Sequence, residues 1–108
     1  MDIELKGIKQ PSDCTNIEEI RNQIDMLDRL ILKTLGVRYQ FVKEIVKYKN
    51  KDYASIKAQD RYEMVLMQRR EWATENGLDP DIVEKIYKEL IHHFIEEEMK
   101  IVAKEKKD

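Results

Sequence analysis

The sequence predicts an all-α fold, a three-helix chain whose N-terminal helix is unusually long. Apolar residues recur in steps of three and four, which places them on one face of a helix. Only three Gly and two Pro interrupt the 108 residues, and no stretch alternates as a strand does. This length suits one domain. We place it at residues 15–103, between an irregular lead-in at 1–14 and a charged tail at 104–108 that we expect to fray.

The first helix is predicted to run from Ile17 to about Lys49. Thr15 and Glu18 fit a capping box, in which the threonine caps the helix and the glutamate follows three residues later. Gly36 weakens such a helix by only about 1 kcal/mol relative to Ala. The apolar stripe consists of Ile17, Ile20, Ile24, Leu27, Ile31, Leu35, Val42 and Ile45.

The predicted first helix is too long for a single compact chain. At about 1.5 Å per residue it spans roughly 50 Å, whereas a compact chain of this size has a diameter of about 35 Å. Its apolar stripe would extend into water. We therefore expect a second copy of the chain to cover it in an intertwined homodimer.

Two further helices are predicted after a polar loop at residues 50–55. The second runs from about Lys57 to Glu75 and stops at Asn76-Gly77, a common C-terminal signal. The third begins with Asp79 as its cap and proline at its first position. Its apolar positions are Ile82, Val83, Ile86, Leu90, Ile91, Phe94, Ile95, Met99 and Val102.

Composition excludes several classes of function. The formal net charge of −2, from 20 basic and 22 acidic residues, argues against a general nucleic-acid binder. No apolar run approaches the roughly 18 residues of a membrane span. Cys14 is a single cysteine, so no intrachain disulfide is possible, and a cytoplasmic protein is expected. We find no phosphate loop, nucleophile–base pair or metal-ligand cluster; His92 and His93 point to different sides of a helix. We therefore expect no metal or cofactor.

Three charged residues fall on apolar stripes, where aliphatic side chains are expected. Arg38 and Lys49 lie on the stripe of the first helix, and Glu98 on that of the third. Buried charges need partners. Arg38 and Lys49 are about 16 Å apart along a helix axis, a gap that suits a small diacid, and arginine binds both oxygens of a carboxylate. The alternatives are an Arg38–Glu98 or Lys49–Glu98 ion pair, or side chains that extend to solvent.

Several segments together resemble the all-helical chorismate mutases. The first helix does so through Ile20-Arg21-Asn22-Gln23-Ile24-Asp25, Leu27-Asp28, Arg38, Val42-Lys43 and Lys49. Three further segments are similar to the isochorismate pyruvate lyases of salicylate synthesis within that family. They are Pro11-Ser12-Asp13-Cys14-Thr15, Trp72-Ala73-Thr74-Glu75-Asn76-Gly77-Leu78-Asp79 and Ile91-His92-His93-Phe94-Ile95. The resemblance covers about residues 11–100.

The resemblance implies an intertwined dimer with two active sites, each built from both chains. Arg21 would enter a site from the partner chain, and the segment after Lys49 would act as a lid. The catalytic residues implied are Lys49, Glu98 and Arg38. The substrate-binding residues implied are Arg21, Arg38, Arg61, Tyr62 and Phe94.

The function expected from the resemblance is an isochorismate pyruvate lyase, which gives salicylate and pyruvate, with chorismate mutase side activity. Such pericyclic reactions need no nucleophile or cofactor. The enzyme holds a flexible diacid in its reactive shape and stabilises charge on the breaking ether oxygen. The alternatives are a chorismate mutase that gives prephenate, and a non-catalytic helical dimer with a binding or regulatory role.

The chain departs from the mutase pattern at two positions. Tyr62 stands where mutases usually have a glutamate that binds the chorismate hydroxyl, and this favours the lyase. Glu98 stands where the family usually has glutamine. A glutamate can donate a hydrogen bond only when protonated. Burial should raise the pKa of Glu98 and nearby cations should lower it, so the sequence leaves the direction of the net shift open.

Overall fold

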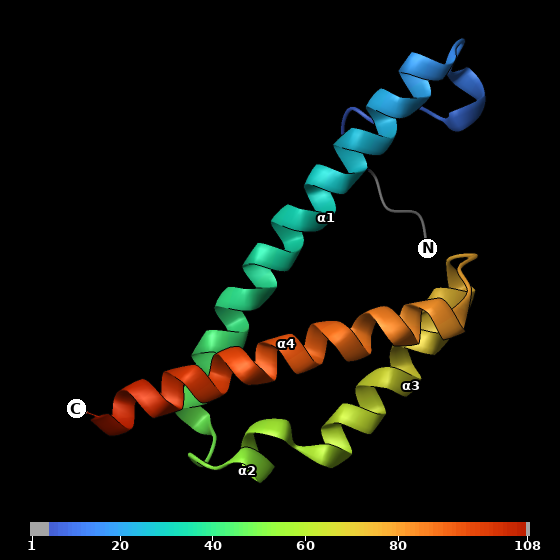
Figure 1. Cartoon of the computed structure of the whole chain (residues 1–108). Coiled ribbons are helices and arrows are strands. Elements are labelled where there is room, and N and C mark those ends of the chain that lie inside the picture. The colour runs from blue at the N-terminus through green and yellow to red at the C-terminus, as the bar shows by residue number, and fades with distance from the viewer. Residues whose placement is uncertain (1–4, 108) are drawn as a thin grey trace. The chain divides into compact units, whose positions relative to one another are not determined.

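The computed structural model describes residues 5–107, and every regular element in that range is helical (Figure 1). The elements are η1 (Pro11–Asp13), α1 (Ile17–Ile45), η2 (Val46–Tyr48), α2 (Tyr53–Lys57), α3 (Gln59–Glu75) and α4 (Pro80–Lys107). The predicted all-α fold and its three long helices are therefore confirmed. The chain divides into two compact units, Met1–Arg38 and Tyr39–Asp108, with the boundary inside α1.

The start of α1 lies close to the prediction, but a different residue caps it. Asn16 Oδ1 accepts the backbone N–H of Glu19 at 2.9 Å, so Asn16 is the cap and Glu19 takes the position predicted for Glu18. Thr15 instead donates its own N–H to the Glu19 carboxylate at 3.0 Å. This hydrogen bond is the main reason that the pKa of Glu19 lies below its usual value. Thr15 and Asn16 are both good capping residues, so the sequence left the register ambiguous by one position.

The segment after α1 is more ordered than the predicted loop. The α-helix ends at Ile45 and tightens into the 3₁₀ turn η2, after which Lys49 is extended (φ −104°, ψ 152°). The predicted polar loop at residues 50–55 contains the start of α2, which Asp52 caps by accepting the N–H of Ser55 at 2.8 Å. Five residues are too few to show a helical period, so the sequence could not reveal this helix.

The turn between α3 and α4 follows the prediction closely. Leu78 donates its N–H to the Ala73 carbonyl at 2.8 Å and Gly77 donates to that of Thr74 at 3.1 Å. Gly77 has φ +73°, and this combination is a Schellman motif. Asp79 then caps α4 by accepting the N–H of Asp81 at 2.8 Å, as predicted.

The fraying of the charged tail stays a prediction, although the tail begins as a continuation of α4. Helix α4 continues to Lys107, and Asp108 lies outside the described range. Val102 is buried and Glu105 pairs with Lys51 at 3.0 Å, so the last turns of α4 have contacts that hold them. The sequence pattern could not show these contacts, because Lys51 is more than fifty residues away from Glu105 in the chain.

The core of the second unit lies where α4 packs against α2 and α3 (Figure 1). One buried cluster of this core consists of Val46, Ile56, Ile95 and Val102. Their burial fixes the short helix α2 on the C-terminal half of α4. Farther along, Arg70 on α3 pairs with Asp81 at 2.9 Å and with Glu84 at 3.7 Å. These contacts hold α2 and α3 against α4.

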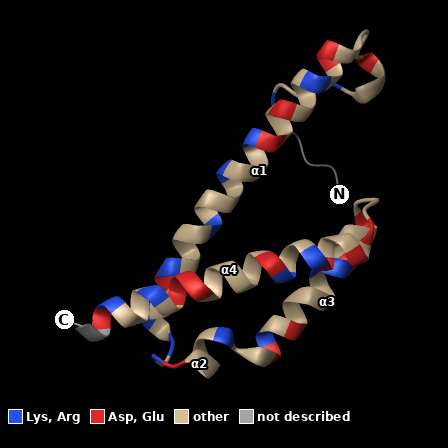
Figure 2. Ribbon diagram, in the orientation of Figure 1, with Lys and Arg blue, Asp and Glu red and all other residues tan. Residues whose placement is uncertain are grey.

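Helix α1 carries large apolar side chains that remain exposed in the single chain. Ile31 is 55% exposed, Leu32 67% and Phe41 73%. The other exposed large apolar side chains of α1 are Ile17, Ile20, Ile24, Met26, Leu30, Val37 and Ile45. Figure 2 shows that uncharged residues make up most of the middle of α1. So much exposed apolar surface on one element is typical of a surface that binds another protein.

Candidate active site

Lys49 and Glu98, two of the three charges that interrupt the apolar stripes, lie together. Lys49 follows η2 and Glu98 belongs to α4, and the Lys49 Nζ to Glu98 Oε2 distance is 3.2 Å. Their side chains are only 20% and 6% exposed. Among the alternatives left open by the sequence, the Lys49–Glu98 ion pair is thus confirmed. Removing a charged pair from water carries a desolvation cost, so the pair is retained at some expense of stability.

The ammonium of Lys49 has a second acceptor in the backbone of α2. Its Nζ donates to the carbonyl oxygen of Ile56 at 2.8 Å. An ammonium has three N–H donors. Ile56 and Glu98 take two of them, and the third can point to a reacting oxygen. The arrangement is a fixed positive charge with one donor to spare, which is suited to stabilising developing negative charge.

Phe94 lies one helical turn before Glu98 on α4, and its ring stacks on that of Tyr39. The ring centroids are 5.1 Å apart, with 26° between the planes. Tyr39 also donates its hydroxyl to Glu97 at 3.4 Å, and Lys43 Nζ lies 4.9 Å from the Tyr39 ring centre. Tyr39 is not among the site residues predicted from the sequence. A tyrosine beside an apolar stripe carries no distinctive signal; only its position directly after Arg38 could have suggested it.

Tyr62, the residue at the glutamate position of the mutases, packs at the edge of the α3–α4 contact. Its ring is nearly parallel to that of His92, with 5.9 Å between centroids and 5° between planes. Lys57 Nζ lies 5.5 Å from the centre of the same ring. His92 is exposed, and its ring packs on that of Tyr62. The neighbouring Arg61, a predicted substrate-binding residue, is exposed on α3.

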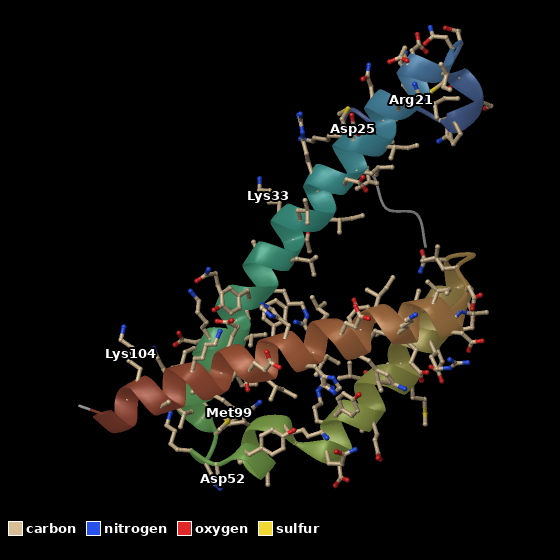
Figure 3. All side chains as sticks on the ribbon, in the orientation of Figure 1. Arg21, Asp25, Lys33, Asp52, Met99 and Lys104 are labelled. Carbon is tan, nitrogen blue, oxygen red and sulfur yellow. The ribbon has the colours of Figure 1, made fainter. Side chains whose placement is uncertain are left out.

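Arg21 and Arg38 belong to the first unit, and the other predicted site residues belong to the second. Arg21 projects from the first turns of α1 (Figure 3), is exposed, and pairs with Glu18 of its own helix at 3.2 Å. Arg38 is partly buried at the end of the unit. The structure therefore brings together Lys49 with Glu98 and Phe94 with Tyr39.

Glu97 and Lys47 lie close to the buried pair in the chain but are more exposed than Glu98 and Lys49. A hydrogen bond from Lys100 is the main reason that the pKa of Glu97 is lowered. A hydrogen bond to Glu44, at 2.8 Å from Lys47 Nζ, raises the pKa of Lys47. Both shifts favour the charged forms, so both groups keep their charges at neutral pH.

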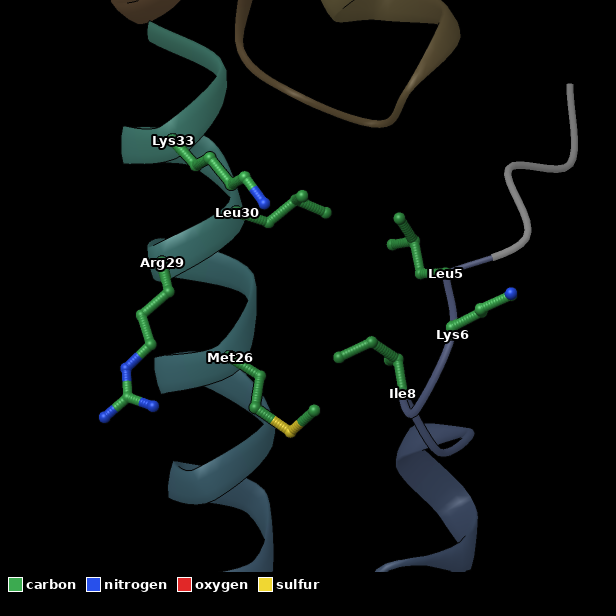
Figure 4. A pocket seen from close by; sticks show the side chains of 7 residues that line it. All are labelled: Leu5, Lys6, Ile8, Met26, Arg29, Leu30 and Lys33. Atoms are coloured by element: carbon green, nitrogen blue, oxygen red, sulfur yellow. The ribbon is translucent and has the colours of Figure 1, made fainter. Parts of the chain in front are cut away.

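The first unit contains a cavity of about 420 Å³ between the lead-in and α1 (Figure 4). Its lining is Leu5, Lys6, Ile8, Met26, Arg29, Leu30 and Lys33, none of which is a predicted site residue. Among the residues that the structure describes, no group of three His, Cys, Asp or Glu side chains is placed to hold a metal ion. In the same range, no helix is both long and apolar enough to cross a membrane.

Comparison with known proteins supports the resemblance noted from the sequence. Residues 20–99 match the family model for chorismate mutase type II. The chain is 40% identical over 93 residues to an isochorismate pyruvate lyase from Pseudomonas aeruginosa, covering 86% of this chain and 91% of that protein. It is 31% identical over 77 residues to a chorismate mutase from Methanocaldococcus jannaschii, covering 71% of this chain and 78% of that protein.

Proposed function

This chain belongs to the type II chorismate mutase family, a family of enzymes, and on that premise we propose that it is an isochorismate pyruvate lyase. It converts isochorismate to salicylate and pyruvate without a cofactor, with chorismate mutase activity as a side reaction. The buried Lys49–Glu98 pair is the observation that carries this proposal. Higher identity to the lyase, at 40%, than to the mutase, at 31%, favours the lyase reaction.

The chemistry requires an anionic substrate to be held in one shape while an ether bond breaks. The carbon–oxygen bond to the enolpyruvyl group breaks as a ring hydrogen moves to that group, so pyruvate leaves and the ring becomes aromatic. Negative charge develops on the ether oxygen. Lys49 faces that oxygen and stabilises the charge, while Arg38 and Arg61 bind the carboxylates.

Glu98 takes the role of a hydrogen-bond donor when it is protonated. Its Oε2 accepts from Lys49 Nζ at 3.2 Å, so the proton of a neutral carboxyl group would lie on Oε1. Oε1–H could then donate to the ether oxygen, as the amide of a glutamine would. In the alternative role, an ionised Glu98 only neutralises Lys49. The pH dependence of the reaction distinguishes these two roles.

The active enzyme is a homodimer in which each site uses both chains. The exposed apolar side chains of α1, with Ile31 55% and Leu32 67% exposed, support this assembly. Arg21 comes from the partner chain to bind substrate. Within its own chain it pairs with the exposed Glu18, so the guanidinium can turn to a carboxylate of the substrate at little cost.

Tyr62 sets the preference for isochorismate. Its aromatic ring, packed against His92, offers no carboxylate to the hydroxyl that chorismate carries. Isochorismate carries its hydroxyl at another ring position and does not need that contact. A buried polar group that lacks its partner discriminates strongly between substrates, so the absence of this glutamate weakens mutase activity more than lyase activity.

The test is to offer the purified protein isochorismate and chorismate separately and to compare kcat/KM. We expect isochorismate to be turned over faster, with salicylate as product. Tyr62→Glu should shift the ratio toward chorismate, whereas the control Tyr62→Phe, which keeps the ring against His92, should preserve it. A clear preference for chorismate, with prephenate as product, would assign the protein instead as a chorismate mutase, the function named for the relative from Methanocaldococcus jannaschii.

A further inference from the structure

The ammonium of Lys49 is held by the end of a helix that the sequence did not reveal. Helix α2 has only five residues, Tyr53–Lys57, and ends where Ala58 adopts a left-handed conformation (φ 49°, ψ 71°). The last carbonyls of a helix have no donor within it. The Ile56 carbonyl is one of these, and the 2.8 Å hydrogen bond from Lys49 Nζ satisfies it.

The side chain of Ile56 fixes that carbonyl in place. It is 1% exposed and packs in the cluster with Val46, Ile95 and Val102. Ile95 and Val102 lie on α4, the helix that also carries Glu98. The carbonyl of Ile56 and the carboxyl of Glu98 are therefore held by one packed core, and together they fix two of the three directions of the Lys49 ammonium.

Hydrogen bonds at the start of α2 hold the helix in the same position. The Asp52 side chain accepts the N–H of Ser55 at 2.8 Å, and the Asp52 carbonyl accepts that of Ile56 at 3.0 Å. Asn50 donates its N–H to the Ser55 hydroxyl at 3.0 Å. Figure 3 shows Asp52 where the chain enters α2. These bonds link Asn50, Asp52, Ser55 and Ile56 to one another, and Ile56 in turn accepts from Lys49.

We propose that Ile56 is a positioning residue for catalysis, which acts through its backbone carbonyl on Lys49 and leaves one N–H of the ammonium aimed at the substrate. This inference rests on the proposed function of Lys49. It changes the role expected for the segment after Lys49, from a covering lid to an anchored support. Because a misplacement of about 1 Å at a reacting group can lower a rate about 100-fold, a small shift of α2 should reduce kcat.

The experiment compares variants that loosen α2 with a control that loosens the core elsewhere. Ile56→Ala removes the anchor, Ile56→Val largely keeps it, and Val65→Ala truncates a side chain of α3 that is 7% exposed and lies outside the Ile56 cluster. We expect kcat to fall on the order of 10- to 100-fold in Ile56→Ala, with KM changed much less. Val65→Ala and Ile56→Val should keep kcat within about threefold even where the melting temperature falls.

A second pair of variants leaves the core untouched in case Ile56→Ala does not fold. Asp52→Ala removes the cap of α2, whereas Asp52→Asn retains a capping side chain. We expect kcat to fall in the first and to be retained in the second. In a Lys49→Met background, Ile56→Ala should cause no further loss of kcat, since there is no ammonium left to position.

The ammonium itself can be observed without substrate, by NMR of protein labelled with ¹⁵N at lysine Nζ. The Lys49 ammonium resonance, identified by its absence in Lys49→Met, should be retained in Val65→Ala and lost or shifted in Ile56→Ala and Asp52→Ala. Unchanged Lys49 resonances in both α2 variants, or equal loss of kcat in Val65→Ala, would overturn the positioning role. Failure of the wild type to turn over either substrate would instead reject the proposed function, and the NMR result would still decide whether Ile56 holds Lys49.

Discussion

The first unit and the core around Lys49 depart from the usual rules of burial in opposite ways. Along α1, apolar side chains are exposed, with Leu32 at 67% and Ile31 at 55%. In the second unit, Glu98 is a charged residue that is only 5% exposed. An exposed apolar stripe is unfavourable unless another surface covers it. A buried charge is unfavourable unless it has a partner or a function.

The contrast shows which kind of partner each region lacks in the single chain. The apolar stripe of α1 suits another protein surface, and a second copy of the chain has one of matching length. The Lys49–Glu98 pair, with a donor to spare on Lys49, suits a small ligand with negative charge. In the proposed enzyme, dimer formation serves both regions, because the partner chain that covers the apolar stripe of α1 also supplies Arg21 to the site that binds the ligand.

We expect the largest loss of enzymatic activity from a substitution of Lys49 in the buried pair. Lys49→Met keeps the apolar stem but removes the charge, and we expect activity to fall at least about 100-fold. Lys47→Ala is the matched control, because Lys47 is exposed and forms an ion pair with Glu44, three residues earlier in the chain. It should retain activity within about twofold. Steady-state kinetics with isochorismate, with thermal melts to verify folding, provide the measurement.

Equal losses in the Lys47 and Lys49 variants would mean that burial at this position has no special role. Loss of a buried partner can cost about 3–5 kcal/mol of stability. Activity should therefore be measured well below the melting temperature of each variant.

A smaller effect, on the shape of the pH profile, is expected from Glu98. If a neutral carboxyl donates to the ether oxygen, kcat/KM should fall as pH rises and Glu98 loses its proton. Glu98→Gln donates at any pH, so its profile should be flat and its activity at pH near 8 retained or raised. Glu97→Gln is the control: its pKa is lowered by Lys100, so this group stays ionised throughout and its replacement should leave the profile unchanged.

A flat wild-type profile between about pH 5 and 8 would contradict the donor role of Glu98, as would a Glu98→Gln profile with the same slope as the wild type. Either result would leave Glu98 with the simpler role of neutralising Lys49.

The sequence predicted the long helices well because each has several turns of regular apolar spacing. The same spacing identified Lys49 and Glu98 as charges out of place, and the turn at Asn76-Gly77 was readable from residue types alone. Helical periodicity shows on which face of its helix a residue lies. It does not show which residue of another element that side chain contacts, so the Lys49–Glu98 pair could be named only as one of several possibilities.

The errors have a common physical origin in contacts between residues distant in the chain. Helix α2 is too short for a pattern, and the burial of Ile56 against α4 reveals it only in three dimensions. Glu105 of the tail pairs with Lys51, more than fifty residues earlier in the chain. The ring of Tyr39 stacks on that of Phe94, which lies 55 residues later in the chain. None of these partners can be read from local sequence.

The most direct test of the central claim is a mixed dimer with one Arg21→Ala chain and one Lys49→Met chain. The two chains carry different affinity tags, and purification on both tags isolates the mixed species. Each homodimer should be inactive, whereas the mixed dimer should recover about half of wild-type activity, because one of its two sites contains both intact residues. A matched control mixes Arg38→Ala with Lys49→Met, two residues proposed to come from the same chain, and should recover nothing. Failure to capture a mixed dimer, or an Arg21–Lys49 mixed dimer as inactive as its parents, would contradict a site shared between the two chains.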